Sequence, residues 1–469
     1  MPTCFYSDNS LPLKKTKGSK LEAGEGAGMS EGTKRYLPLA TLLIISGAMF
    51  AGHFGVGDVI FPAVLGRDSG ATWFPAALGY FIMNSIGVWL AYMGVARQDK
   101  TMAGISRDVL GKTIGGVYVI IPVLIQILFI LPRVSSATHE MAMASFFPGV
   151  PLWATLLVYF LLNFYLASSR SKVIDRIGKL LSPALILFIL ILLVVGVVAP
   201  NAKVAAEGTK NAIGGGLLNG YNTMNALAAF LLGGWILNEL KMRKVEDKPS
   251  QTANLIRLGL FTAIALGITS TGLVYLGAST GTLFPKAEIG VLSVEIAGSL
   301  LGVIGKAIFA VLIALACITT SASITSMAGD MFSEVSGGKV KYLWVTMAAS
   351  ITGFALGLVG LSRIVRFTVP WLLLVYPSVI VLIITSQFSK FQQFRMTVAA
   401  GVATSVFFSI GDFLGAMGFP GNPMGKIVAK LPLGNISFGW LVPTVVVMIV
   451  VLFVSGEVKK LSTPNAPAN

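Results

Sequence analysis

Residues 47–62 read GAMFAGHFGVGDVIFP and lie inside the first long hydrophobic segment of the 469-residue chain. This stretch holds four glycines, a proline and two titratable side chains, His53 and Asp58. A continuous helix through it would be weak, because each glycine costs about 1 kcal/mol relative to alanine. A backbone that opens inside a bilayer must satisfy its N–H and C=O groups without water. The stretch therefore predicts a broken helix whose freed groups bind a ligand.

The composition is that of an integral membrane protein. Hydrophobic residues make up 55% of the chain and charged residues 12%, whereas soluble domains carry about 25% charged residues. A membrane helix needs about 20 apolar residues, and the apolar runs do not alternate as barrel strands would. The sequence therefore predicts an all-α membrane protein with about twelve transmembrane helices, near residues 37–63, 72–96, 113–134, 152–168, 181–199, 217–240, 257–279, 303–328, 342–360, 363–385, 396–418 and 437–455.

The net charge of +15 is concentrated in alternate loops between these segments. Basic residues cluster on the cytoplasmic side of helical membrane proteins, so the charge orients the chain and argues against a nucleic-acid partner. The pattern places both termini in the cytoplasm. The basic groups lie within residues 14–35, 97–112, 170–179, 241–257, 339–341, 390–395 and 459–460.

Three parts of the chain are expected. Residues 1–36 form a polar tail of the composition typical of disorder, residues 37–456 form the membrane domain, and residues 457–469 form a second cytoplasmic tail. No cleavable signal precedes the first span, so that span is expected to act as its own signal.

The two cysteines, Cys4 and Cys317, support neither a disulfide framework nor a zinc site. Because phosphate-loop and metalloprotease motifs are absent from the sequence, we expect no enzyme.

A second glycine-rich segment, residues 213–235, begins IGGGLLNGYNTMNAL and lies five predicted spans after the first. Two broken helices at corresponding positions of two halves are typical of inverted-repeat transporters with a site at the midplane. The sequence thus predicts a 5+5 inverted repeat with broken first and sixth helices, followed by two extra helices. Close packing through small residues is the alternative. It explains the glycines but not the polar residues Asp58, Asn219, Asn222, Thr223 and Asn225.

Six motifs occur in constant order between residues 37 and 455: FGVGDVIFP at 54–62, LPRVSS at 131–136, DRIGKLLSP at 175–183, GYNTMNALA at 220–228, ACITT at 316–320 and VYP at 375–377. Together they resemble the branched-chain amino acid:cation symporter family, the BrnQ-type carriers. The resemblance implies a leucine-transporter-like fold in a bacterial cytoplasmic membrane. It also implies import of leucine, isoleucine or valine with Na⁺ or H⁺, without a cofactor or an obligatory protein partner.

Two other functions remain open from the sequence. One is a related carrier for another hydrophobic amino acid, aromatic or sulfur-containing. The other, from a different class, is a channel or a membrane sensor. A channel would line its path with repeated rings of polar groups, whereas this chain gathers them at two unequal breaks.

Asp58 is the leading candidate for a functional residue, because a lone carboxylate in hydrocarbon must be paired, metal-bound or protonated. In the family's usual pattern asparagine stands at its position and aspartate at that of Asn225, so the two are exchanged here. We therefore predict that Asp58 and Asn225 face each other across the broken helices; the alternative puts Asp58 in a wet vestibule. His53, five residues earlier, is either a proton relay or a neutral, hydrogen-bonded histidine.

The transported amino acid needs partners for both of its charged groups. Amides at the start of the half-helix after the first break suit a carboxylate, and carbonyls and polar side chains of the second segment suit an ammonium. Asp58 also belongs to the expected substrate site. The predicted substrate ligands are Gly55, Gly57, Asp58, Gly220, Tyr221, Thr223 and Asn225.

The motif at 316–320 places the Ala316 carbonyl beside the hydroxyls of Thr319 and Thr320, because residues three and four apart share a helix face. The resemblance implies that this face and carbonyls near Ala51 and Phe54 hold the co-transported cation. The alternative is that both threonines bond to their own helix.

Arg133 and Glu140 are seven residues apart on the predicted third span and share similar faces. They are predicted to form an extracellular gate, with a structural ion pair or anchoring at the membrane interface as the alternatives. Beyond the transported monovalent cation, the sequence indicates no metal.

Overall fold

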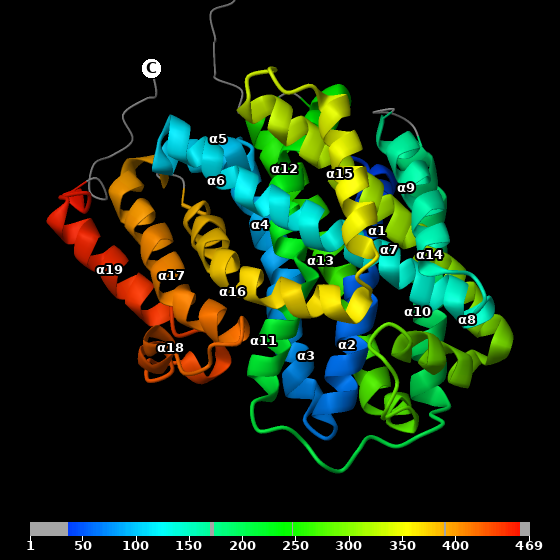
Figure 1. Ribbon diagram of the computed structural model, residues 1–469. Coiled ribbons are helices and arrows are strands. Elements are labelled where there is room, and N and C mark those ends of the chain that lie inside the picture. Colours follow the sequence, from blue (N-terminus) through cyan, green and yellow to red (C-terminus); the bar gives the residue numbers. More distant parts are fainter. Residues whose placement is uncertain (1–35, 169–172, 246, 389–390, 460–469) are drawn as a thin grey trace, which may run out of the picture. The chain divides into compact units, whose positions relative to one another are not determined.

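The computed structural model describes residues 36–168, 173–245, 247–388 and 391–459, without the side chains of 173–182 and 391. The predicted tail at 1–35, the basic residues 170 and 172, the end of the chain from 460 and the side chains of most of the 175–183 motif lie outside this description. The described chain is helical, with one isolated β-bridge between Gly70 and Gly208 and no strand (Figure 1).

Among the described residues 36–168 and 173–198 there are ten α-helices, three of which continue through turns of π-helix. They are α1 (Leu39–His53), α2 (Val56–Ser69), α3 (Trp73–Phe81) with η1 (Ile82–Ile86), α4 (Gly87–Gln98), α5 (Met102–Leu110), α6 (Lys112–Ile125) with η2 (Gln126–Ile130), α7 (Leu131–Thr138) with η3 (His139–Met143), α8 (Ala144–Phe146), α9 (Leu152–Ser168) and α10 (Val173–Val198).

The second half contains the longest helices. They are α11 (Ala212–Thr223), α12 (Asn225–Met242), α13 (Lys248–Ala278), η4 (Thr280–Leu283), α14 (Leu292–Val335), α15 (Tyr342–Gly357), α16 (Leu361–Thr385), η5 (Phe391–Phe394), α17 (Arg395–Ala416), α18 (Pro423–Val428), η6 (Gly434–Ile436) and α19 (Leu441–Val454). Helix α14 is kinked at Gly302, where φ is 69°.

The all-helical prediction is confirmed, and each predicted span overlaps an observed helix. Six helices of the described chain are long and apolar enough to cross a membrane, or seven if the bent α1–α2 pair is one span. Four shorter apolar helices, Leu152–Ser168, Pro183–Val198, Tyr342–Gly357 and Leu441–Val454, lie within other predicted spans. The number twelve and the inverted repeat stay predictions.

The first break is present where the glycine-rich stretch places it. Helices α1 and α2 are bent by 69° relative to each other across Phe54 and Gly55. The Gly55 amide donates to the carbonyl of His53, 2.8 Å away. In a continuous helix it would donate to Ala51, four residues back. The break therefore frees the Ala51 carbonyl from its helical partner.

The second break is a single residue. Helix α11 ends at Thr223, α12 begins at Asn225, and Met224 between them is left-handed, with φ of 61°. Met224 lies within the predicted segment, but the glycines of that segment do not break the helix. They all lie inside α11, at Gly214, Gly215, Gly216 and Gly220. A Cβ on Gly216 would overlap the Ala76 carbonyl oxygen of α3. Close packing, the alternative for the glycines, therefore holds for Gly216.

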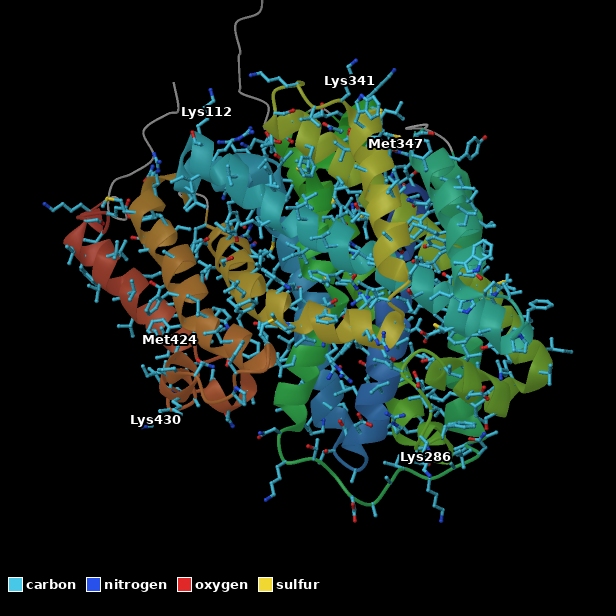
Figure 2. All side chains as sticks on the ribbon, in the orientation of Figure 1. Lys112, Lys286, Lys341, Met347, Met424 and Lys430 are labelled. Carbon is cyan, nitrogen blue, oxygen red and sulfur yellow. The ribbon has the colours of Figure 1, made fainter. Side chains whose placement is uncertain are left out.

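The two broken helices lie in the middle of the bundle (Figure 1). Helix α2 packs on α13, where a Cβ on Gly66 would overlap the Val274 carbonyl. Lysines from four of the loops lie at opposite ends of the helices. Figure 2 shows Lys112 and Lys341, expected inside, at one end of the helices, and Lys286 and Lys430 at the other.

Candidate functional site

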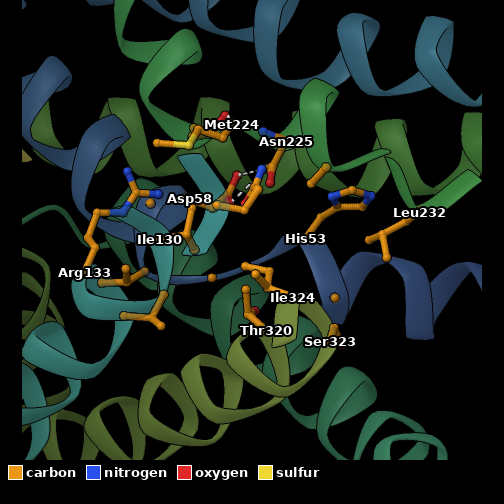
Figure 3. Close-up of a pocket in the computed structure, with 18 of the residues that line it drawn as sticks. His53, Asp58, Ile130, Arg133, Met224, Asn225, Leu232, Thr320, Ser323 and Ile324 are labelled. Atoms are coloured by element: carbon orange, nitrogen blue, oxygen red, sulfur yellow. Dashed lines mark hydrogen bonds between the residues drawn. The ribbon is translucent and has the colours of Figure 1, made fainter. Parts of the chain in front are cut away.

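A small cavity lies between the two helix breaks (Figure 3). Its walls come from the α1–α2 break, the α11–α12 break, the third predicted span and α14. The volume is about 30 Å³, roughly the share of one water in the liquid. The cavity must therefore widen to hold an amino acid. The polar residues that line it include His53, Asp58, Arg133, Thr223, Asn225 and Thr320.

Asp58, at the first break, accepts hydrogen bonds from the side-chain amides of Asn225 at the second break and of Asn84. Asn225 Nδ2 donates to Asp58 Oδ1 at 2.8 Å and to Oδ2 at 3.0 Å. Asn84 Nδ2 donates to Asp58 Oδ1 at 2.9 Å. The carboxylate is 1% exposed, so in this conformation it does not lie in an open vestibule. The predicted contact between Asp58 and Asn225 is present.

Asn84 was not predicted, although it holds this cluster together. Its Oδ1 accepts from Asn225 Nδ2 at 2.8 Å and from Thr223 Oγ1 at 3.1 Å, and its Nδ2 also donates to Ser270 Oγ at 3.1 Å. Asn84 lies in the π-helical turn Ile82–Ile86, and such turns are frequent at functional sites. The signal for Asn84 in the sequence was a single polar amide side chain within an apolar predicted span.

His53 lies at the cavity with its ring against Tyr92 of α4. Its Nε2 is 2.8 Å from the Tyr92 hydroxyl, and the ring is 3% exposed. Nδ1 has no hydrogen-bond partner among the described residues. The geometry is that of a histidine hydrogen-bonded within the bundle, and a proton-relay role stays a prediction.

Arg133 and Glu140 do not pair with each other. Arg133 Nη1 donates to the Asn222 carbonyl at 2.6 Å, and the guanidinium lies 5.2 Å from the centre of the Phe61 ring. Glu140 Oε1 accepts from the Leu361 amide at 3.3 Å. The structural ion pair that the spacing suggested is therefore absent from this conformation of the described chain, and a gate role stays a prediction.

The threonine face of α14 lies against the first break. Thr319 Oγ1 donates to the Ala316 carbonyl at 2.8 Å, which is the bond to its own helix that the alternative proposed. Thr320 Oγ1 has no partner among the described residues. A Cβ on Gly55 would lie 3.4 Å from that oxygen. The Thr320 hydroxyl is thus next to the backbone that the break frees.

The predicted substrate ligands divide into two groups. Gly55, Gly57, Asp58, Thr223 and Asn225 line the cavity, whereas Gly220 and Tyr221 do not.

The carbonyls of Gly220 and Tyr221 already have partners within the chain. The Gly220 carbonyl accepts from Thr223 Oγ1 at 2.7 Å, and the Tyr221 carbonyl accepts from the Met224 amide at 3.0 Å. The Tyr221 ring packs on Tyr376, with 4.6 Å between ring centres. The structure therefore does not bring these two residues to the candidate site.

Residues 39–458 match the family described as "Branched-chain amino acid transport protein". The chain belongs to this family. It is 31% identical to the branched-chain amino acid permease BraB of Bacillus subtilis, over 88% of this chain and 95% of that protein. It is 30% identical to the branched-chain amino acid transport system 2 carrier protein of Pseudomonas aeruginosa, over 87% and 94% of the two chains.

The fold is similar to that of solved transporters. One is Mhp1, a nucleobase-cation-symport-1 family transporter, in a closed conformation with bromovinylhydantoin bound. The TM-score is 0.60 at 11% identity, over 88% of this chain and 93% of that one. Inward-facing Mhp1 gives 0.55 at 12% identity, over 90% and 94%. The family and its named permeases identify a protein of amino acid transport and not an enzyme, and the apolar helices identify a multi-pass membrane protein.

Proposed function

We propose that the protein is a secondary active symporter that imports leucine, isoleucine or valine with Na⁺ or H⁺ by alternating access. The observation that carries the proposal is the buried Asp58–Asn225–Asn84 cluster in a cavity between two helix breaks. A ligand bound there touches both halves of the chain. The proposal includes twelve spans and a leucine-transporter-like 5+5 inverted repeat.

The substrate's ammonium group is assigned to Asp58. Neutral amides, rather than a cation, hold this carboxylate, so its charge is available to attract an ammonium. Thr223 and Asn225 complete the polar side of the site. Apolar side chains of Ile130, Leu232 and Met327 also line the cavity, and such walls suit an aliphatic side chain.

The co-transported Na⁺ is assigned to the space between the first break and α14. Hard cations prefer oxygen ligands, and the Ala51 carbonyl and Thr320 hydroxyl lack partners in the helices that carry them. Thr319 keeps lone pairs while it donates to Ala316, and the Phe54 carbonyl lies in the break. If H⁺ is the coupling ion instead, His53 with Asp58 is the assigned carrier.

The chain is assigned to the cytoplasmic membrane of a bacterium, with both termini inside. The parts are a cytoplasmic tail at 1–36, a transport domain at 37–456 and a second tail at 457–469. The partners are the amino acid, a monovalent cation and the lipid bilayer. The separation of lysines at the two ends of the helices supports this orientation.

The test is uptake of labelled leucine by proteoliposomes under separate Na⁺ and H⁺ gradients, with phenylalanine and methionine among the competitors. We expect one gradient to concentrate leucine, and isoleucine and valine to compete best. Strong competition by phenylalanine or methionine alone would favour a carrier for another hydrophobic amino acid. If neither gradient concentrates a branched-chain amino acid, the proposal is wrong.

A matched pair of threonine variants identifies the coupling ion. Thr320→Val removes an unpartnered hydroxyl beside the break, and we expect a roughly tenfold higher Na⁺ requirement if Na⁺ drives uptake. Thr368→Val removes a hydroxyl that bonds to its own helix in α16 and should leave the Na⁺ requirement unchanged. Equal effects of the two variants would remove Thr320 from the cation site.

A further inference from the structure

The guanidinium of Arg133 is a buried charge that no carboxylate contacts directly, although Asp58 attracts it at longer range across the same cavity. Its side chain is 2% exposed, and among the described residues no carboxylate forms an ion pair with it. It donates to the Asn222 carbonyl and lies over the Phe61 ring, and its Nε has no hydrogen-bond partner among the described residues. Burying a charge is costly unless it is paired and hydrogen-bonded. This environment suits a site that an anion completes.

Arg133 lies against the first turn of α2, and Gly57 permits this approach. A Cβ on Gly57 would lie 2.9 Å from Arg133 Nη2. Helix α2 begins at Val56 after Gly55, with no side-chain cap. The positive end of a 14-residue helix and a guanidinium therefore meet at one wall of the cavity. Both groups favour an anion there.

Asp58 lies in the same cavity and on the same turn of α2 (Figure 3). Its carboxylate is held by amides of Asn84 and Asn225 rather than by Arg133. The cavity therefore presents a negative and a positive group that do not neutralise each other by contact. A zwitterion with an ammonium and a carboxylate on one carbon complements this arrangement.

We propose that Arg133 binds the α-carboxylate of the transported amino acid, together with the amides at the start of α2. This inference rests on the proposed transport function and names a specificity residue for it. Arginine can hold a carboxylate through two parallel hydrogen bonds, which a point charge such as lysine cannot reproduce. The proposal replaces a gate role for Arg133 with direct contact to substrate.

The test compares equilibrium binding of leucine and leucinamide to the purified full-length protein. Leucinamide keeps the ammonium and the side chain but lacks the carboxylate. For Arg133→Gln we expect leucine affinity to fall about ten- to a hundredfold, because a hydrogen bond to a charged group is lost. Leucinamide affinity should change by less than about threefold. Arg363→Gln, at an exposed arginine at the start of α16, should change neither.

A structural role for Arg133, holding only the Asn222 carbonyl, would lower the affinity for both ligands equally. Such an equal fall, or no fall for leucine, would overturn the proposal. If Arg133→Gln does not fold, Arg133→Lys replaces it in the test. A smaller fall in leucine affinity with unchanged leucinamide affinity supports the proposal, and equal falls for both ligands overturn it. If the unaltered protein binds no branched-chain amino acid, the proposed function itself fails, and this inference with it.

Discussion

The two helix breaks differ in how they are made. At the first, two residues leave the helix, the chain turns by 69° and a backbone carbonyl loses its partner. At the second, Met224 alone is left-handed, and its amide bonds within the same segment, while the Thr223 hydroxyl bonds both there and to Asn84. The first break therefore offers backbone groups, whereas the second offers side chains, chiefly Asn225.

This difference suggests a division of labour at the candidate site. Backbone groups of the first break are suited to a cation and a carboxylate, because both recognise main-chain dipoles. Side chains of the second break instead hold Asp58 in place. Changes at the second break should therefore act through Asp58.

The largest effect on leucine uptake is expected from Asp58 and Asn225, whose contact joins the two breaks. Asp58→Asn should lower the initial rate of leucine uptake by about 100-fold or more, because it removes the charge assigned to the ammonium. Asn225→Asp alone should also be strongly impaired, since two carboxylates would then lie within hydrogen-bond distance. The double exchange should recover to within about tenfold of the original rate, because one carboxylate is restored.

The measurement is uptake by proteoliposomes that contain equal amounts of monodisperse protein. Equal amounts matter because a misfolded single variant would imitate a lost charge. If the double variant takes up leucine no faster than the faster single variant, one carboxylate shared between the two positions is not sufficient. The carboxylate must then be at position 58.

A smaller effect is expected from Asn84, which links the second break to Asp58. Asn84→Ala leaves Asp58 and Asn225 each without one partner, and we expect uptake to fall about ten- to a hundredfold. Asn163→Ala is the matched control, because Asn163 is also fully buried and donates to two hydroxyls, those of Thr325 and Ser350, outside the cavity.

Thermal unfolding in detergent should show both asparagine variants destabilised. Uptake per folded molecule should fall for Asn84→Ala only. A comparable loss in both would mean that Asn84 supports the bundle and not the substrate site.

Much of the first break could be predicted from the sequence. Glycine density and a misplaced carboxylate are local signals, and each has a direct physical cost in a membrane helix. The contact of Asp58 with Asn225 was also predicted, because the two residues are exchanged relative to the pattern of the family that the sequence resembles. Thr320 lines the cavity, and its place beside the first break was implied by the family resemblance rather than by the residues alone.

The remaining site residues could not be predicted, because their roles depend on helix rotation. Asn84 reaches Asp58 from a π-helical turn, which changes the face of a helix without a clear sequence signal. Arg133 was paired with Glu140 by spacing, although each contacts a distant segment. Glycine is ambiguous in the same way, because it permits both an open backbone and close helix contact.

The smallest effect is expected from two glycines of α11, and it shows whether each is needed for close helix contact or for an open backbone. Gly216→Ala would place a Cβ on the Ala76 carbonyl, and overpacking of this kind costs about 1–3 kcal/mol. Its neighbour offers the control: a Cβ on Gly215 would meet only Leu65, at an ordinary 3.8 Å. Gly215→Ala should be neutral or stabilise the helix by up to about 1 kcal/mol. The melting temperature in detergent should therefore fall for Gly216→Ala only.

Uptake by the folded fraction completes the comparison. Because both glycines lie in helix and neither lines the cavity, Gly215→Ala should transport normally. If Gly215→Ala instead abolishes uptake without loss of stability, the glycines of α11 must open during transport. In another conformation the second break would then extend over more residues than Met224. The difference between the two breaks would in that case hold for only one conformation of the transport cycle.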